Sequence, residues 1–528
     1  MTFRISPGVY SREKDISDYV PNVATSIGAI VGYSAKGNVD DIVLITNQQQ
    51  FIAEYGQPEL GEYFHYSALA FLEKGNQLYC YRVHNGALYG GVAISQSGSD
   101  NLAFSIGRSS KAYADDSEYP NALFYVTAKD PGTWNNDLGI RITNIDAANY
   151  EFDIEVYDLD DDGNYALIET FKVSRKDQKD GNGRQQYLED RINGNSQYIY
   201  VADNTALADT VMPQPQATTL AMIGGAVGSA VSDSDVIAGW ELFENPDDID
   251  VRILINGGYT SVAVQTQIKT VAEGRRDCIA VLDVPYANLT SIASIVSWRD
   301  STQNFNSSYC ALYAPWIKIY DQYNDRLVEV PPSGYVASMY AYNDYIAEPW
   351  YAAAGFNRGV MNVLGFTDVF TEGERDTLYA AEVNPLQTFR GEGNVIWGQK
   401  TQATRSSALD RVNVRRMLIV LEKAIATMLR SFVFEPNSEQ TRFRVTAVIE
   451  EYLDKLYSRG AFQAEAGDKG YRVLCNTTNN TAATIDANEL HVDIFVKPSK
   501  AAEYIQLTTI ISKTGASFDE IITRNVFI

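Results

Sequence analysis

The last third of the chain carries the pattern that most restricts its fold. Apolar side chains in Arg444–Arg459 recur at the spacing of one helix face, and Val412–Phe432 is predicted to form a second long helix. Asn437 or Ser438 can cap the later helix, because the side chain of either residue accepts a hydrogen bond from a free backbone N–H group. Leu490–Val496 alternates apolar and polar residues, which predicts a half-buried strand. We therefore expect a C-terminal α+β domain.

Two other stretches alternate strands with helices, which predicts an α/β core built on a parallel sheet. The elements expected from apolar runs and helical spacing are Ile27–Tyr33 (strand), Tyr63–Glu73 (helix), Leu78–Val83 (strand), Val251–Ile255 (strand), Ser261–Glu273 (helix), Cys278–Asp283 (strand) and Ala314–Tyr320 (strand). Asn47 is expected to cap a short helix between the first two of these elements.

Residues between these two stretches show strand patterns alone. The expected strands are Leu123–Ala128, Gly139–Ile142, Tyr150–Tyr157 and Tyr165–Val173, the last two forming a hairpin. An all-β block inside an α/β frame indicates an inserted domain. With 528 residues, two to four domains are expected. The predicted fold is α+β and multidomain, divided into 1–20 (extended arm), 21–85 (core), 86–218 (inserted β domain), 219–383 (core), 384–503 (C-terminal domain) and 504–528 (second arm).

Charge and composition exclude several classes of protein. The formal net charge is −24, so the chain repels nucleic-acid phosphates and also other copies of itself. Assembly would then require local complementarity or strand pairing. The four cysteines are far apart, which favours reduced thiols. The first residues lack the apolar region of a secretory signal, and no apolar run reaches the ~20 residues of a membrane helix. We expect a soluble protein made in a cytoplasm.

One segment matches a calcium-binding loop. Asp158, Asp160, Asp162 and Glu169 occupy the ligand positions of an EF-hand. The flanking residues alternate like strands, whereas an EF-hand needs helices, so an acidic hairpin turn is the favoured interpretation. The motif keeps open an alternative function, an acidic Ca²⁺-binding surface or adhesion protein.

Other chemical motifs carry little weight. Gly224–Ser229 resembles part of a phosphate loop without its lysine, so a flexible connector is favoured. His65, His84 and His491 stand in no zinc motif, and no nucleophile elbow is present. We expect no cofactor and no enzyme activity. An enzyme with an unmarked α/β site remains a third possibility.

A basic helix stands out in this acidic chain. Residues 410–430 carry five Lys or Arg against two Asp or Glu, a net charge of +3. Arg411, Arg415, Arg416 and Lys423 could face an acidic partner. The alternative is a solvated face with internal ion pairs, which contribute little.

Several motifs, in their shared order, resemble contractile tail sheath proteins of myovirus tails and related injection machines. The most specific block comprises Asn384-Pro385, Gly391–Thr401, Val414-Arg415-Arg416 and Phe434-Glu435-Pro436-Asn437. Pro7-Gly8-Val9-Tyr10 is similar to the family's opening, and Asp130–Asn136 to a turn in its inserted domain. Ala354–Gly359 departs from the family's usual Pro-Ala-Asn run.

The resemblance implies a mechanical role in a virion, or in a phage-derived particle, assembled in the host cytoplasm. Sheath subunits form stacked hexameric rings around an inner tube, next to baseplate and tail terminator proteins, and contraction drives the tube through a target cell envelope for genome ejection. Their terminal arms add strands to neighbouring C-terminal domains. The residues expected in this exchange are Val9, Tyr10, Leu490, Val492, Ile494, Ile505, Leu507 and Val526.

The resemblance also implies that the C-terminal domain is innermost and the β insertion outward. Arg411, Arg415, Arg416 and Lys423 then become candidates for the tube-facing surface. We expect no nucleic-acid partner and no direct membrane insertion. Reversing the first three charges to Glu is expected to weaken assembly on the tube while the monomer still folds.

Overall fold

The computed structural model describes residues 26–96, 102–106, 121–160, 162–465 and 467–503. Both predicted arms lie outside these ranges. The proposed exchange residues within the arms, which therefore have no described position, are Val9, Tyr10, Ile505, Leu507 and Val526.

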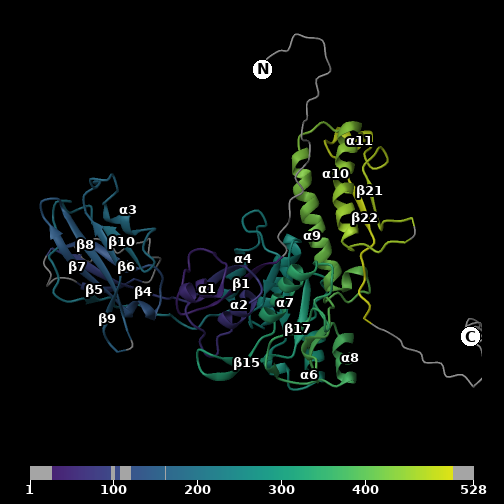
Figure 1. Cartoon of the computed structure of the whole chain (residues 1–528), viewed down its shortest axis with the longest axis horizontal. Coiled ribbons are helices and arrows are strands. Elements are labelled where there is room, and N and C mark those ends of the chain that lie inside the picture. Colours follow the sequence, from purple (N-terminus) through teal and green to yellow (C-terminus); the bar gives the residue numbers. More distant parts are fainter. Residues whose placement is uncertain (1–25, 97–101, 107–120, 161, 466, 504–528) are drawn as a thin grey trace, which may run out of the picture.

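A nine-stranded sheet forms the centre of the molecule (Figure 1). Its strands, in spatial order, are β17 (Val360–Met361), β20 (Gly393–Ile396), β19 (Val383–Phe389), β14 (Cys310–Ala314), β13 (Ile279–Asp283), β12 (Ile253–Ile255), β1 (Ile27–Tyr33), β3 (Gln77–Val83) and β2 (Val43–Ile45). The six strands from β19 to β3 run parallel, and the outer strands are antiparallel. The predicted parallel α/β core is thus confirmed.

Helices cover both faces of this sheet, because successive side chains of a buried strand point to opposite faces. Ile30 packs on one face with α1 (Gln48–Tyr55), α2 (Phe64–Leu72) and α7 (Ser333–Ile346). Ala29 and Val31 pack on the other, whose helices are α4 (Asp233–Glu241), α5 (Val262–Arg275), α6 (Ile292–Ser297) and α8 (Glu372–Ala380). Asn47 caps α1 as predicted, accepting from the Gln50 backbone N–H at 2.8 Å.

Two sequence-based boundaries in this region need correction. The strand predicted at Ala314–Tyr320 is two strands, because β14 ends at Ala314 and Pro315 offers no N–H group to the ladder. The second piece, β15 (Ile317–Asp321), joins β16 (Arg326–Val330) and β18 (Gly365–Phe366) in a separate sheet. A domain boundary at residue 384 would cut β19, which pairs with β14.

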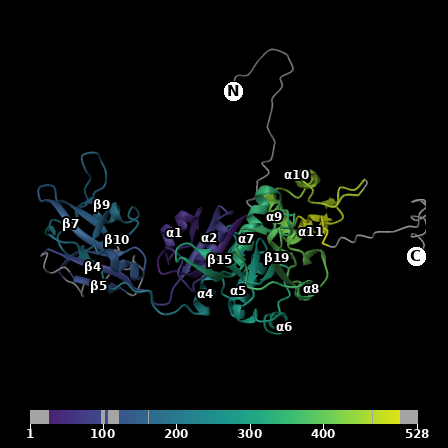
Figure 2. The ribbon, with the colours of Figure 1, turned by 60° about the horizontal axis from the view of Figure 1, so that its bottom comes forward.

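The β-rich part forms a separate lobe, shown in blue in Figures 1 and 2. One of its two sheets contains β10 (Ile199–Asp203), β6 (Ala122–Ala128), β4 (Tyr89–Ser95) and β5 (Leu102–Ile106). The other contains β11 (Leu220–Ala221), β7 (Leu138–Asp146), β8 (Glu151–Leu159) and β9 (Tyr165–Val173). A common apolar core lies between them, and a short helix, α3 (Leu188–Ile192), also packs there.

A buried arginine joins the lobe to the central sheet. The Arg82 guanidinium donates to the carbonyls of Ser34 (2.7 Å) and Gly37 (2.6 Å) in the core and of Pro131 (2.8 Å) in the lobe. Burial lowers the pKa of Arg82 to about 10. Gly132 approaches the core so closely that a Cβ there would lie 2.2 Å from the Ala35 carbonyl oxygen.

A buried carboxylate fixes the carboxyl end of the parallel sheet. Asp283, the last residue of β13, accepts from the backbone N–H and the hydroxyl of Ser333, each at 2.7 Å, where α7 begins. It also accepts from Asn256 Nδ2 (3.0 Å) and the Gly258 N–H (3.2 Å). One side chain therefore holds β12, β13 and α7 together.

The C-terminal module, residues 404–503, rises from the central sheet in Figure 1. It contains α9 (Val412–Leu429), α10 (Glu439–Ser458), α11 (Ala482–Asp486), β21 (Tyr471–Leu474) and β22 (Asp493–Val496). Both long helices are predicted correctly, and Ser438 caps α10 by accepting from the Thr441 N–H at 3.2 Å. Within the described ranges, no helix is both long and apolar enough to cross a membrane.

Candidate inter-subunit surface

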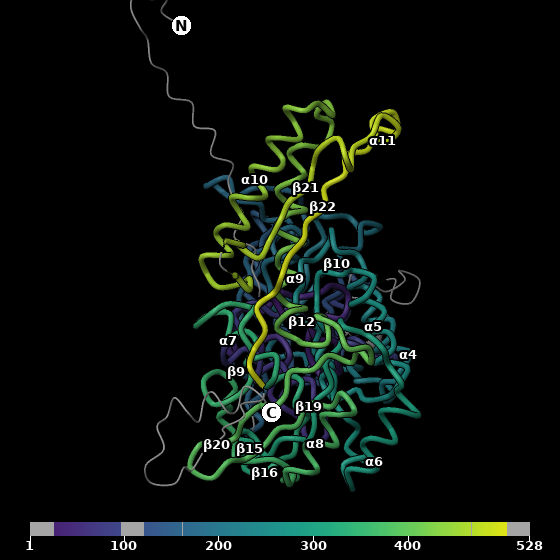
Figure 3. Tube along the Cα trace, turned by 90° about the vertical axis from the view of Figure 1, so that its right-hand side faces the viewer, coloured from purple at the N-terminus to yellow at the C-terminus, as the bar shows by residue number. Residues whose placement is uncertain are grey.

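The two strands of the C-terminal module lie beside its helices, which bury an apolar core between them (Figure 3). The core residues of the helices are Met417, Leu421, Ile425 and Met428 from α9 and Val445, Ile449, Leu453 and Leu456 from α10. In the sheet, Val473 lies opposite Ile494. The outward face of the sheet carries the exposed Arg472 and Phe495, the latter 57% exposed.

The predicted alternation is confirmed in burial but not in length. Leu490, Val492 and Ile494 all pack partly buried against the helical core. The regular strand begins only at Asp493, because the Asn480 side chain takes both backbone groups of His491, at 2.8 and 2.9 Å. The Asn480 side chain thus makes the two hydrogen bonds that a neighbouring strand would otherwise make with His491.

This sheet is smaller than a stable sheet usually is. Within the described residues, β21 and β22 pair only with each other, so each has one edge without a neighbouring strand. A two-stranded sheet is marginal on its own and offers unpaired backbone N–H and C=O groups at its edges. These edges are where an extended segment can add.

The basic side chains proposed to face the tube have partners inside the chain. Arg415 and Arg416 are each only 5% exposed. Arg416 Nη2 lies 2.7 Å from Asp344 Oδ2, and the Arg415 guanidinium stacks 4.1 Å from the Tyr309 ring centre. Reversing these charges would disturb the fold itself, so it cannot test tube contact.

The other two basic residues are also paired. Arg411 Nε binds Glu503 Oε1 at 2.6 Å, and Lys423 Nζ lies 3.0 Å from Asp277 Oδ2 and 3.2 Å from Asp250 Oδ1. These pairs match the alternative of internal ion pairs, although the helix face is buried and not solvated as that alternative assumed. Direct contact of these side chains with a tube stays a prediction.

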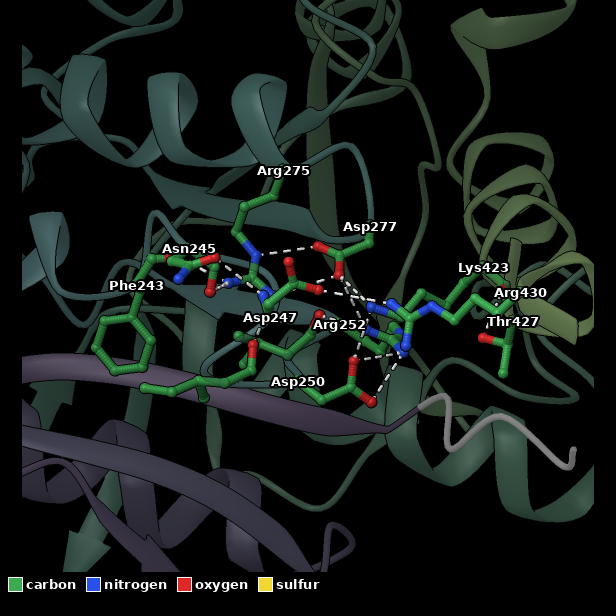
Figure 4. Close-up of polar contacts among 12 residues, drawn as sticks. Phe243, Asn245, Asp247, Asp250, Arg252, Arg275, Asp277, Lys423, Thr427 and Arg430 are labelled. Atoms are coloured by element: carbon green, nitrogen blue, oxygen red, sulfur yellow. Dashed lines mark hydrogen bonds and ion pairs between the residues drawn. The ribbon is translucent and has the colours of Figure 1, made fainter. Parts of the chain in front are cut away.

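Lys423 belongs to a larger ionic cluster that fastens α9 to the central sheet (Figure 4). Arg252 lies 2.8 Å from Asp250, and Arg275 lies 3.0 Å from Asp277. Burial alone would raise the pKa of Asp250, but Arg252 and Lys423 outweigh it and hold that pKa below its usual value. The cluster therefore attaches α9, and with it the C-terminal module, to the central body.

Replacing Arg416 by Ala is expected to lower the free energy of unfolding by about 3 kcal/mol, because it leaves the buried Asp344 carboxylate without this cation. Urea unfolding followed by circular dichroism measures the change. Arg430→Ala, at the residue that directly follows α9, is the matched control. The pair of Arg430 with Asp247 is 3.5 Å long and exposed, so its loss is expected to cost under about 0.5 kcal/mol. Equal effects of the two variants would contradict this interpretation.

The EF-hand-like segment is a hairpin turn, as favoured from its sequence. Asp160 Oδ1 accepts from the backbone N–H groups of Asp162 (3.1 Å) and Asn164 (2.7 Å), between β8 and β9. Glu169 is bound instead to Ser196 Oγ at 2.6 Å, and Asp158 lies in β8. Among the described residues, no group of three or more His, Cys, Asp or Glu side chains is placed to hold a metal ion.

Calorimetric titration is therefore expected to detect no tight Ca²⁺ uptake by this turn. The Asp160→Asn variant, which removes one of the carboxylates, is expected to give the same trace as the unchanged chain. Saturable binding with a dissociation constant below about 10⁻⁵ M, lost in that variant, would restore the calcium-binding hypothesis.

Two further candidates for chemistry, His65 and the glycine-rich segment, are packed structural groups. His65 Nε2 lies 3.3 Å from Ser34 Oγ, but both residues are fully buried and desolvation lowers the pKa of His65 to about 4. The glycine-rich segment is packed and not the expected loose connector, because a Cβ on Gly225 would lie 2.3 Å from the Gly132 carbonyl oxygen.

Sequence reasoning missed the acidic partners of α9, namely Asp250, Asp277, Asp344 and Glu503. Each lies 72 or more residues from its cation, so local spacing gives no indication of the pair. The only sequence signal was the excess of cations on one helix of an acidic chain.

Comparison with protein families matches two consecutive regions of the chain. A model described as the phage tail sheath protein central domain matches residues 229–402, and one described as the phage tail sheath C-terminal domain matches residues 404–512. Together they cover more than half of the 528 residues. The junction between them follows β20 and precedes α9, consistent with the structural division.

Two curated tail sheath proteins are similar in sequence. The protein of Vibrio phage KVP40 is 32% identical over 370 residues, covering 65% of this chain and 53% of the relative. That of Enterobacteria phage T4 is 29% identical over 381 residues, covering 68% and 56%. This chain thus spans just over half the length of these relatives.

A solved structure shares the fold. The PVC sheath complex of an extracellular contractile injection system, in its contracted state, superposes with a TM-score of 0.56 at 16% identity, covering 97% of this chain and 99% of that chain.

Proposed function

This chain belongs to the phage tail sheath protein family, and from that premise we propose that it is a structural subunit of a contractile tail sheath, without enzyme activity. Copies assemble as stacked hexameric rings around an inner tube. Contraction drives the tube through the envelope of a target cell, so that the genome can be ejected.

The observation that carries this proposal is the incomplete sheet of the C-terminal module. Among the described residues, β21 and β22 each keep one edge without a neighbouring strand, and 25 residues follow Glu503. Residues 504–528 and 1–20 are the proposed arms, which add strands to the C-terminal modules of neighbouring copies through Ile505, Leu507, Val526, Val9 and Tyr10. Backbone hydrogen bonds of an added strand tolerate rotation of the attached bodies better than interlocked side chains do.

The distribution of charge supports this placement of the contacts. Residues 404–503 carry 14 Lys or Arg and 13 Asp or Glu, a net charge of +1, whereas the whole chain carries −24. The remaining residues therefore hold a charge of −25. Nearly neutral modules can pack closely near the axis, while the acidic outer parts keep separate particles apart.

We assign the other parts of the chain to matching positions. Residues 21–85 and 219–383, with 384–401 added because of β19 and β20, form the central body. Residues 86–218 form an inserted β-rich domain that faces outward. The C-terminal module, residues 404–503, faces the tube.

The subunit needs no nucleotide for this work. A sheath assembled in an extended, metastable state shortens when its subunits rotate into a state with more contact, and a few kcal/mol per copy suffices in a large cooperative assembly. Its proposed partners are further copies of itself, a tail tube, a baseplate and a tail terminator. We place it in the virion tail after assembly in the host cytoplasm, without nucleic acid or membrane insertion.

Negative-stain electron microscopy of the purified chain over a range of concentrations tests the proposal. Hollow striated cylinders, formed alone or with a tail tube, are the expected result. Uniform small particles at every concentration, with and without the tube, would contradict it.

A further inference from the structure

The last described residues of the chain cross from the C-terminal module to the central body. After β22, the backbone stays with its own module, where Ser499 N–H donates to the Ala461 carbonyl at 3.0 Å. Lys500 and Ala502 are exposed, and the Glu503 side chain then meets Arg411, which directly precedes α9. Glu503, the last described residue, is therefore held away from the sheet of β21 and β22.

Glu503 is held there by several donors. Arg411 donates to both carboxylate oxygens, from Nε at 2.6 Å and from Nη2 at 2.9 Å. Gln399 Nε2 (3.0 Å) and the Tyr379 hydroxyl (3.1 Å) donate as well. A paired guanidinium contact of this kind fixes direction as well as distance, because its two bonds are parallel. Tyr379 and Gln399 belong to the central body, whereas Arg411 lies at the start of the C-terminal module.

The position of Arg411 is fixed by the helix that follows it. It directly precedes α9, whose later residues Arg416 and Lys423 are fastened to Asp344 and Asp277 of the central part. The Arg411–Glu503 pair itself is less buried, with side-chain exposures of 23% and 18%. Both side chains are thus only partly buried, and their contact fixes the position of Glu503, the last described residue.

We propose that Arg411, assisted by Tyr379 and Gln399, is a positioning residue that holds Glu503 and so directs residues 504–528 toward a neighbouring copy. The proposal rests on the proposed function for its purpose, but the anchoring itself can be measured on the isolated subunit. Without the anchor, the free length of the arm increases and its effective concentration at the neighbour's sheet edge falls.

The test uses the full-length chain in four forms: unchanged, Arg411→Glu, Glu503→Lys, and both substitutions together. On unassembled subunits, electron paramagnetic resonance measures the mobility of a spin label attached through an Ala502→Cys substitution, since Ala502 is exposed and the chain's own four cysteines are buried. Sedimentation at increasing concentration measures assembly, and thermal unfolding monitors the fold. Lys469→Glu, which breaks the exposed 2.5 Å pair with Asp454 in the same module, is the matched control.

Each single variant is expected to increase the mobility of the label and to raise the concentration for half-maximal assembly about tenfold, at nearly unchanged melting temperature. The double variant restores the opposite charges and is expected to recover both properties, whereas the control changes neither. Unchanged label mobility in the single variants, or no recovery in the double variant, would overturn the proposal. Failure of the unchanged chain to assemble would count against the sheath function, and the label mobility would still show whether Arg411 holds Glu503.

Discussion

Deleting residues 1–20 is expected to abolish sheath assembly and to leave the stability of the subunit unchanged. The four apolar cores of the described residues are built from Ile27 onward, so we expect this fold to form without the deleted segment. In the assembly, an added strand of four residues makes about four backbone hydrogen bonds of roughly 1 kcal/mol each. Its loss weakens each contact by about 4 kcal/mol, or roughly a thousandfold.

Sedimentation and electron microscopy measure the assembled fraction, and urea unfolding measures the stability of the subunit. A chain in which residues 1–20 are replaced by a Gly/Ser segment of equal length is the control for chain length alone. It is expected to fail as well, because such a sequence is a poor strand former. Normal cylinders from either chain would show that assembly does not need residues 1–20.

Replacing Asp283 by Ala is expected to lower the free energy of unfolding by about 5 kcal/mol, because four buried donors lose their acceptor at once. Chemical unfolding followed by circular dichroism measures the loss. Asp209→Ala, at an exposed position, is expected to change stability by less than about 0.5 kcal/mol. A loss under about 1 kcal/mol for Asp283→Ala would show that the donors find other partners.

The same carboxylate predicts a pH dependence. Burial raises the pKa of Asp283 from its ordinary value of 3.8 to about 6, against the hydrogen bonds from Ser333 and Asn256, which lower it. Since the folded chain holds this proton more tightly than the unfolded chain, the related stability is full below pH 3.8 and is lost as the pH rises through about 6. The stability difference between the unchanged chain and Asp283→Asn should therefore fall by about 2.5 kcal/mol from pH 4 to pH 7. A constant difference would contradict the shift.

Local patterns predicted much of the fold because local physics decides it. The caps at Asn47 and Ser438 and the hairpin between β8 and β9 follow from side chains and spacing within a few residues. The parallel pairing of β12 with β13 follows from the helix between them. These elements need no distant partner to be recognised.

Long-range pairing accounts for the errors. The cations of α9 looked free because Asp344 is 72 residues and Asp277 is 146 residues from its partner in α9. Strand β19 was assigned to the C-terminal domain, since its pairing with β14 cannot be seen from its own residues. A strand was predicted where β22 lies, but its shortening at His491 depended on the side chain of Asn480. The addition of strands from other copies at β22 stays a prediction.

A high-resolution cryo-electron microscopy reconstruction of the assembled particle would show directly whether neighbouring copies exchange strands. We expect the sheet formed by β21 and β22 to gain strands from the terminal segments of other copies, joined by continuous backbone hydrogen bonds. A sheet that stays two-stranded, with both terminal segments folded onto their own subunit, would contradict it.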